Sequence, residues 1–516
     1  MNTRTISLLL LFFMMSLPKV FAQEQAENPI IFADVPDLSM VKHGDNYYMS
    51  STTMHMSPGV PIMKSKDLVN WEIVSYAYDT LADIPELRLE AGKNAYGRGS
   101  WASSLRFHEG RFYVSTFSGT TGKTYIFSSE DPESGKWEKA SFSPSLHDNS
   151  LVFDNGKVYM IYGGGSIRIV ELESDFSGVK PETDHVLIEN ASAPAGEDIM
   201  LPAEGSQLFK HDGKYYLFHI TWPRNGMRTV VIHRADNLLG PYKGKLALQD
   251  LGVAQGGLIE GPDGNWFSYL FRDYGAVGRI PYLVPVEWKD GWPVLGKDGK
   301  VPEKLELPRS KGLIPGIVAS DEFNRENAEN SLPLVWQWNH NPENEYWSLK
   351  EKQGYLRLTN FRKDTAFLQT RNTLTQRTFG PKSSAEISLE LGGLKNGDVA
   401  GIGLLQSKYG LIGIRKEKDR LSLISMKGEN GKNWIEESIP YNSETVFLKV
   451  VCDFENKKDE AQFYFSEDGE NWKSIGSILK MEYKLTHFMG YRFALFNYAT
   501  QETGGFADFD YFRMSE

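Results

Sequence analysis

The sequence has almost no cysteine and no excess of positive charge. Cys452 is the only cysteine among 516 residues, so no disulfide framework is available and none lies near Ala22 to carry a lipid. Stability must therefore come from packing. Lys and Arg number 56 against 67 Asp and Glu, a net charge of -11, which argues against nucleic acid or an anionic membrane as the main partner. A neutral partner is predicted.

Several motifs that carry well-known chemistry are also missing. The sequence contains no HExxH, GxxxxGK[ST], GxSxG or CxxC, the patterns of zinc peptidases, phosphate-binding loops, nucleophile elbows and thiol or metal sites. Almost nothing in residues 30 to 300 has helical periodicity. Aromatic residues make up 13% of the chain, with 12 Trp and 24 Tyr, a composition typical of all-β packing and of flat stacking surfaces.

The first 22 residues have the pattern of a cleavable export signal. Arg4 is followed by a nearly uninterrupted apolar run from Ile6 to Leu17, and Val20 to Ala22 provides small residues at the cleavage spacing. The run is too short for a bilayer-spanning anchor. Residues 1–22 are therefore predicted to be a signal peptide, and the mature protein to be periplasmic or secreted without a membrane anchor.

A turn of Gly, aromatics and an apolar strand recurs five times. The repeats are GDNYYMSS, GRFYVSTF, GKVYMIYG, GKYYLFHI and GNWFSYLF, beginning at Gly44, Gly110, Gly156, Gly213 and Gly264. A spacing of roughly 40 to 50 residues is typical of propeller blades, which cannot bury both faces without neighbours. Residues 23–315 are therefore predicted to form a five-bladed β-propeller.

A second domain is predicted after the Pro- and Gly-containing linker ELPRSKGLIPG. From about Asp321 to Glu516 strand-like runs alternate with turns, for example QGYLRLTN, AEISLELGG and ETVFLKVVCDF. Their length and spacing favour a β-sandwich of the jelly-roll or concanavalin type over residues 316–516. The fold class is thus all-β with two domains.

Three acids precede the Gly turns of different blades by seven to nine residues. Asp37, Asp148 and Glu204 lie ahead of Gly44, Gly156 and Gly213, at the predicted entry of innermost strands. Because innermost strands surround one axial cavity, these carboxylates should converge, whereas three independent solvated strand ends would have no reason to share this phase.

These segments resemble glycoside hydrolase family 43, in particular its two-domain β-xylosidase and α-L-arabinofuranosidase members. The resemblance is carried by VPDLS, HDNSLVFDNGKVYMIY, PAEGSQLFKHDGKYYL and VGRIPYLVPVEWKDGWPVLG, and in the second domain by LVWQWNHNPENEYWSL and TGGFADFDYF. It implies that Asp37 is the general base, that Asp148 modulates a pKa and orients the substrate, and that Glu204 is the general acid. Hydrolysis needs one protonated and one ionised carboxyl, and a third acid would raise the pKa of Glu204 by repulsion.

Other positions have weaker assignments. Arg279 resembles the family's sugar-contacting arginine, with an inter-blade ion pair as the alternative, and Trp101 and Trp222 either stack on a sugar ring or belong to the core. Gln207 and Ala254 stand where many relatives carry histidines, and Ala254 makes an axial cation doubtful. No cofactor is predicted for catalysis. The acids Asp321 or Glu322 and Asp508 either hold a structural calcium in the second domain or are solvated.

Together with the three acids, the resemblance implies an inverting exo-glycosidase acting on an oligosaccharide. It would release terminal β-D-xylosyl or α-L-arabinofuranosyl units from plant-derived xylan or arabinoxylan fragments. Two alternatives are an arabinan- or galactan-active hydrolase of the same family and a non-catalytic carbohydrate-binding propeller. The sequence leaves open the preferred sugar, the linkage and the oligomeric state.

Overall fold

The structure is a computed structural model that describes residues 25–312, 316–325 and 330–516. The predicted signal peptide, residues 1–22, therefore lies outside the described residues. The described chain is built from strands and short 3-10 turns, and contains no α-helix. Among these residues no helix is both long and apolar enough to cross a lipid bilayer.

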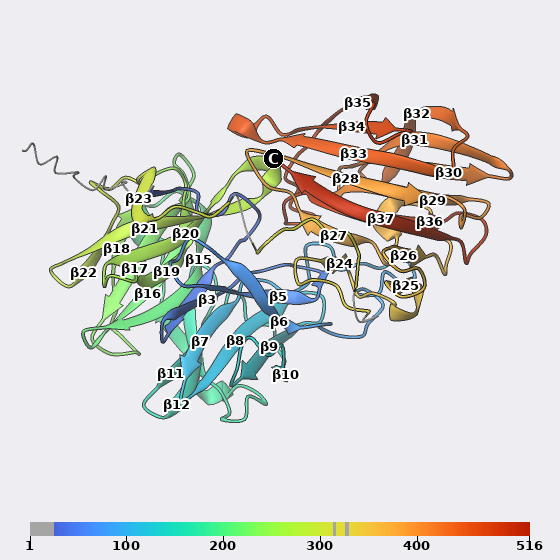
Figure 1. Ribbon diagram of the computed structural model, residues 1–516. Helices are drawn as coiled ribbons and strands as arrows, with labels where there is room; N and C mark the ends of the chain where they lie inside the picture. The colour runs from blue at the N-terminus through green and yellow to red at the C-terminus, as the bar shows by residue number, and fades with distance from the viewer. Residues whose placement is uncertain (1–24, 313–315, 326–329) are drawn as a thin grey trace, which may run out of the picture.

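Five four-stranded antiparallel sheets form the predicted propeller (Figure 1). Their innermost strands are β2, β7, β11, β15 and β19, and each contacts the innermost strand of the next sheet until β19 meets β2. The strands of sheets one to three are β2 (Ser39–His43), β3 (Asn46–Ser50), β5 (Gly59–Ser65), β6 (Glu72–Tyr78); β7 (Ser104–His108), β8 (Arg111–Ser118), β9 (Lys123–Ser129), β10 (Glu138–Phe142); β11 (Ser150–Asp154), β12 (Lys157–Tyr162), β13 (Ile167–Glu171) and β14 (His185–Ile188).

The fourth and fifth sheets follow the same order from the axis outward. Their strands are β15 (Ile199–His211), β16 (Lys214–Pro223), β17 (Thr229–Ala235), β18 (Lys243–Leu248); β19 (Ala254–Glu260), β20 (Trp266–Asp273), β21 (Arg279–Lys289) and β22 (Trp292–Leu295). Outside the blades, β1 (Gln25–Glu27) pairs with β23 (Lys304–Pro308) and brings the two ends of the propeller segment together.

The C-terminal domain is a two-sheet sandwich, as predicted. One sheet has the order β32-β31-β30-β29-β36-β27-β24-β4 and the other β25-β26-β37-β28-β33-β34-β35. The strands are β24 (Gln337–Asn339), β25 (Trp347–Ser348), β26 (Leu356–Thr359), β27 (Leu374–Arg377), β28 (Lys382–Glu390), β29 (Asp398–Leu405), β30 (Tyr409–Glu417), β31 (Arg420–Glu429), β32 (Lys432–Tyr441), β33 (Thr445–Asp453), β34 (Glu460–Ser466), β35 (Lys473–Lys480), β36 (Arg492–Ala499) and β37 (Phe506–Ser515).

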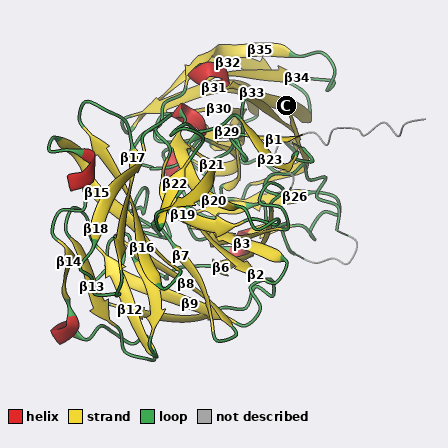
Figure 2. Cartoon of the chain, turned by 90° about the vertical axis from the view of Figure 1, so that its left-hand side faces the viewer, coloured by secondary structure: helices red, strands yellow, loops and turns green. Residues whose placement is uncertain are grey.

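The two domains are joined by backbone pairing. The edge strand β4 (Met56–Ser57) comes from the first blade but pairs with β24 of the sandwich. Figure 2 shows the sandwich strands β30 to β35 stacked beyond one end of the blades. A shared sheet buries both partners' backbone groups, so separating the domains would leave hydrogen-bonding groups unpaired.

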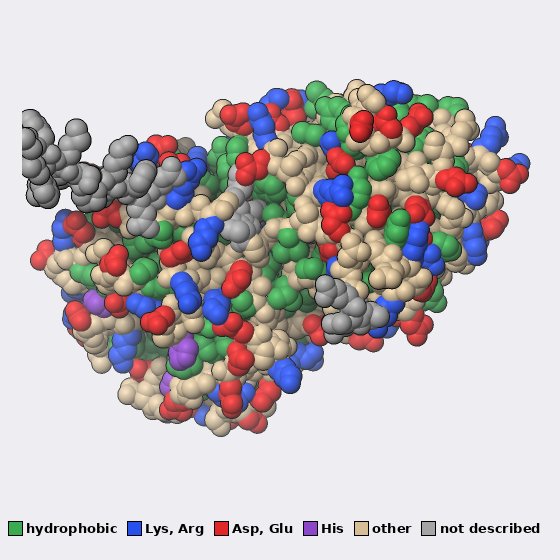
Figure 3. Space-filling view, in the orientation of Figure 1, with side chains coloured by type: hydrophobic (Ala, Val, Ile, Leu, Met, Phe, Trp, Pro, Cys, Tyr) green, Lys and Arg blue, Asp and Glu red, His purple; other side chains and the backbone are tan. Residues whose placement is uncertain are grey.

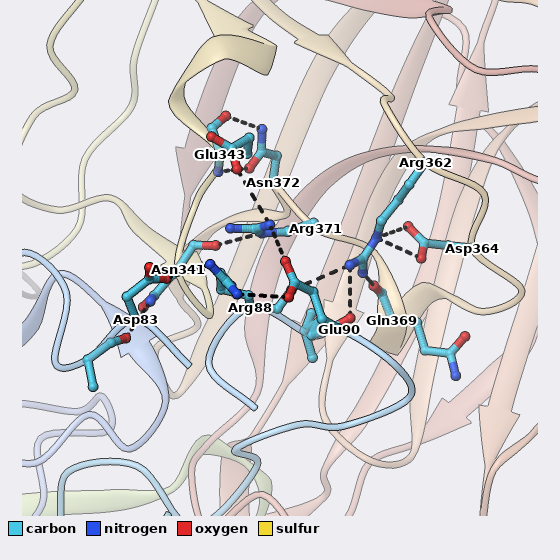
Figure 4. A network of polar contacts seen from close by, with 12 residues as sticks. Asp83, Arg88, Glu90, Asn341, Glu343, Arg362, Asp364, Gln369, Arg371 and Asn372 are labelled. Carbon is cyan, nitrogen blue, oxygen red and sulfur yellow. Dashed lines mark hydrogen bonds and ion pairs between the residues drawn. The ribbon is translucent and has the colours of Figure 1, made fainter. Parts of the chain in front are cut away.

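An ionic network reinforces this contact (Figure 4). Buried Arg371 of the sandwich lies 3.6 Å from both Glu90 of the propeller and Glu343, while Arg88 pairs with Glu90 at 3.0 Å. Arg362 donates to the Leu89 carbonyl at 2.8 Å. On the face shown in Figure 3, acidic and basic side chains are interspersed, an arrangement that offers no extended electrostatic attraction for a polyanion.

Candidate active site

The first acid, Asp37, precedes innermost strand β2 and is paired with Arg279. The Asp37 residue is 4% exposed, and its Oδ1 accepts a hydrogen bond from Arg279 Nη1 at 2.8 Å. Burial raises the pKa of Asp37, while the Arg279 charge opposes that rise. The Asp37 backbone has a φ of 54°, a left-handed conformation that costs free energy and is found preferentially at functional sites.

The second and third acids lie together and share a histidine. His147 Nε2 is 3.0 Å from Glu204 Oε2 and 4.0 Å from Asp148 Oδ2. Burial raises the pKa of Asp148 to about 7, and the charges of Glu204 and Asp37 add to the effect. Burial would lower the pKa of His147, but its hydrogen bond to Glu204 and the charge of Asp148 raise it to about 9. The three predicted acids therefore interact, as the phase of the repeats indicated.

Four of the five inner strands converge on one guanidinium group, that of Arg106. Arg106, in β7, donates from Nη2 to Ser150 Oγ at 2.7 Å and to Gln207 Oε1 at 2.9 Å. Its Nη1 approaches Ser39 Oγ at 3.4 Å, and Ser39 itself donates to Gln207 at 3.3 Å. Strands β2, β7, β11 and β15 are thus held together by one cation that belongs to the protein. Gln207, which departs from the family pattern, accepts hydrogen bonds here from Arg106 and Ser39.

A loop of the sandwich completes the wall of the site. Phe488 lies with its ring 4.9 Å from the Arg279 guanidinium and 4.9 Å from the Trp101 ring. The neighbouring Gly490 N–H donates to Asp34 Oδ2 at 3.0 Å, and Asp34 Oδ1 accepts from the Arg279 N–H at 2.8 Å. The loop is therefore anchored to the same strand that carries Arg279, so the second domain contributes an aromatic surface beside the predicted base.

The predicted substrate-binding residues occupy different positions around the acids. Arg279 is 4% exposed and directly paired with Asp37. Trp101 is half-buried and stacks on Phe117, which in turn packs edge-on to His147. Trp222 is half-buried near the end of β16, two residues beyond the partner of Glu204, and donates to the Gly226 carbonyl. Arg279 and Trp101 adjoin the acids, whereas Trp222 lies further out along β16.

The acids predicted to hold calcium are each engaged by a different arginine. Asp321 accepts two hydrogen bonds from Arg325, and Asp508 accepts two from Arg357. Glu322 is likewise paired with Arg513. The structure thus assigns these carboxylates to ion pairs, in place of a common metal site. Ala254, at the start of β19, is fully buried.

A metal-like grouping does occur at the acids themselves. His147, Asp148 and Glu204 present ligand atoms within 4.8 Å of one another, the one such group among the described residues. Within this group His147 contacts both carboxylates, at 3.0 Å from Glu204 and 4.0 Å from Asp148.

The sequence patterns did not indicate three residues of the site, which are His147, Phe488 and Arg106. His147 directly precedes Asp148 in the quoted HDNSL motif, and that adjacency was the available signal. Phe488 lies far along the chain from the other site residues, within a loop that has no repeat. Arg106 occupies the second blade, the inner strand of which contributes no acid to the predicted set. Only the folded arrangement brings His147 to Glu204, Phe488 to Arg279 and Arg106 to Gln207.

A five-bladed propeller with three interacting carboxyl groups and aromatic side chains beside them offers the paired acid and base that glycoside hydrolysis needs. Residues 26–293 match the model of glycosyl hydrolases family 43, and residues 320–515 match the β-xylosidase C-terminal concanavalin A-like domain. The chain belongs to glycosyl hydrolases family 43 and is a glycoside hydrolase.

Named relatives extend over most of this chain. A β-xylosidase of Formosa agariphila is 28% identical over 94% of this chain and 89% of its own length. A non-reducing end α-L-arabinofuranosidase of Bacteroides ovatus is 29% identical over 65% of each. The solved structure of a bifunctional GH43-CE protein of Bacteroides eggerthii is 61% identical, with a TM-score of 0.94 over 96% of this chain. This chain spans 64% of that bifunctional protein's length.

Proposed function

We propose that the protein is an inverting exo-glycosidase that releases terminal β-D-xylosyl or α-L-arabinofuranosyl units from xylan-derived oligosaccharides. Asp37 is the general base that activates water, Glu204 is the general acid that protonates the leaving oxygen, and Asp148 orients the substrate and modulates proton affinity. The names of the two curated relatives support this choice of sugars. No cofactor takes part in the proposed mechanism.

The difference in exposure between the two main acids is the observation that carries the proposal. The Asp37 side chain is 4% exposed; burial raises its pKa, and the paired guanidinium of Arg279 opposes that rise and favours the ionised form. The Glu204 side chain is 26% exposed. In a pocket that admits the end of a chain, the departing portion points toward the opening, so the more exposed carboxyl suits the acid. The buried, ionised carboxylate then suits the opposite face, where water attacks.

The experiment that tests this function combines substrate choice with stereochemistry. Purified protein would be assayed with aryl β-xyloside, aryl α-arabinofuranoside and aryl β-galactoside. Proton NMR of the sugar first formed from a β-xyloside should show the α anomer, because one displacement inverts the anomeric centre once. Formation of the β anomer would refute inversion. Activity on the galactoside alone would favour the galactan-active alternative, and no hydrolysis of any glycoside would favour a binding propeller.

The location of the protein is proposed from its N-terminal sequence. We infer that residues 1–22 direct export and are removed, which leaves a periplasmic or secreted enzyme that meets its polysaccharide fragments outside the cytoplasm. N-terminal sequencing of protein recovered from cell fractions would test this inference. A chain starting at Met1 in the cytoplasmic fraction would contradict it.

Replacing Phe488 by Ala should impair substrate binding more than folding. The ring covers Arg279 and adjoins Trp101, so its loss removes an apolar wall and lets water reach the acids. A decrease in kcat/KM of about 10- to 100-fold is expected, mainly through KM, since one apolar contact is worth roughly 1–3 kcal/mol. The matched control is Leu485→Ala on the same loop, because Leu485 is 68% exposed. Equal kinetics for wild type and Phe488→Ala would exclude Phe488 from the site.

Replacing Asp148 by Asn and replacing His147 by Gln should shift the pH–rate profile in opposite directions. Asp148→Asn removes a negative charge that helps the acid retain its proton, so the alkaline limb should move to lower pH. His147→Gln removes a group whose raised pKa keeps it positive near neutrality, so the same limb should move to higher pH. Profiles of kcat/KM for both variants test the pair. Shifts in the same direction would show that the charges beside Glu204 do not determine the alkaline limb of the profile.

A further inference from the structure

Directly behind the base, two buried arginines from the sandwich face a small cavity between the domains. The cavity is bounded by Asp34, Pro36, Thr52, Thr53 and Met54 of the propeller and by Arg377, Phe488, Met489 and Arg492 of the sandwich. The cavity volume is about 10 Å³, close to the least that holds one water-sized particle.

Arg377 is the side chain that makes the cavity unusual. It is 1% exposed, and its Nε donates to the Asp34 carbonyl at 2.9 Å. Its Nη1 and Nη2 are both buried, and among the described residues neither makes a hydrogen bond of normal geometry. The neighbouring Tyr76 hydroxyl donates to the Leu334 carbonyl, and its oxygen is close enough to Arg377 to interact with the guanidinium by charge and by a side-chain hydrogen bond. Tyr76 is neutral, however, so it supplies no compensating negative charge. Buried donors left unpaired are costly, and more so on a charged group.

Arg492, on the same cavity, adds a second positive charge with neutral partners. It is 4% exposed and donates to Thr375 Oγ1 and Gln337 Oε1, each at 2.9 Å. Burial, together with the charge of Arg377, lowers the pKa of Arg492 to about 9. Neither hydrogen-bond partner of Arg492 is anionic, so these contacts supply no compensating charge.

The surrounding charges do not balance. Three guanidinium groups, those of Arg279, Arg377 and Arg492, adjoin two carboxylates, those of Asp34 and Asp37. Asp37 is paired with Arg279, and both Asp34 oxygens accept backbone N–H groups. The next charges outward, Arg228 and Asp273, pair with each other at 2.6 Å. One positive charge is therefore left over in a buried region, where an uncompensated charge is strongly unfavourable.

We propose that this cavity binds one chloride ion. A monovalent, single-atom anion matches the size of the space, accepts hydrogen bonds from the Arg377 donors and cancels the excess charge, whereas a water molecule would meet only the first two requirements. The ion would join the sandwich to the propeller. It would also support the active site, because Pro36 precedes the base and Phe488 contacts Arg279.

The direct test is a crystal of the full chain in which bromide replaces chloride. Data collected at the bromine absorption edge should show an anomalous peak within hydrogen-bonding reach of Arg377 Nη1 or Nη2. A map with bromide at surface positions and none in this cavity would overturn the proposal. This measurement uses the wild-type protein, so it does not depend on the folding of a variant.

A thermal measurement tests the same site in solution. The melting temperature should rise by roughly 2 to 5 °C as chloride replaces gluconate at constant ionic strength, because gluconate is too large for a one-particle cavity. Arg377→Met should abolish this rise. The control Arg371→Met removes another buried interdomain arginine, one already paired with Glu90 and Glu343, and should retain it. A wild-type melting temperature that is the same in both salts would overturn the proposal.

Discussion

Glu204→Gln should lower kcat on xylobiose by about 100- to 10,000-fold, the usual contribution of a positioned proton donor. Its effect on an aryl xyloside with a strongly acidic phenol should be far smaller. A sugar alkoxide is a poor leaving group and needs the proton of Glu204, whereas a stabilised phenolate departs without one. The ratio of the two losses, measured by steady-state kinetics, therefore isolates proton donation from substrate positioning.

The control for this variant is Glu197→Gln, which removes an exposed acid seven residues earlier in the same segment. Both substrates should be hydrolysed at wild-type rates by that control. If Glu204→Gln slowed xylobiose and the activated aryl xyloside to the same extent, Glu204 would be a positioning residue, and the assignment of the acid would have to move within the cluster of His147 and Asp148.

The fold could be predicted because each blade carries the same short local sequence pattern. A Gly turn followed by aromatic strand residues marks each blade, and five such marks fix the number of sheets. The same phase placed Asp37, Asp148 and Glu204 ahead of or within the innermost strands β2, β11 and β15, where the structure has them. The position of each acid along its strand thus followed from periodicity and needed no knowledge of distant contacts.

The partners of the acids could not be predicted in this way. Arg106 reaches Ser150 and Gln207 across blade boundaries, and Phe488 reaches Arg279 across the domain boundary. Such contacts depend on how blades close and domains dock, and no local pattern encodes either. The carboxylates of Asp321 and Asp508 were predicted to share a calcium ion, but each is paired with an arginine. Those arginine partners are set by strand register and loop conformation, which the local sequence does not reveal.

Asp37→Asn should abolish hydrolysis of good and poor leaving groups alike, because water must be activated whichever group departs. The rate should fall by about 100- to 10,000-fold on both substrates. Asn keeps an oxygen that can accept the hydrogen bond from Arg279 Nη1, now 2.8 Å from Asp37 Oδ1. It does not keep the charge, and unpairing a buried guanidinium costs about 3–5 kcal/mol. A lower melting temperature is therefore expected, and folding must be confirmed by circular dichroism before kinetics are compared.

Added azide distinguishes loss of the general base from loss of the folded structure in the Asp37→Asn variant. The anion needs no general base, so it can attack the anomeric carbon while Glu204 still protonates the departing oxygen, and the product is a glycosyl azide of inverted configuration. Added azide should restore turnover of an activated aryl xyloside by Asp37→Asn and leave Glu204→Gln on xylobiose unchanged, since that variant lacks the proton donor. A glycosyl azide of retained configuration would show a covalent intermediate instead. Near-normal hydrolysis by Asp37→Asn without azide would remove Asp37 from the role of base.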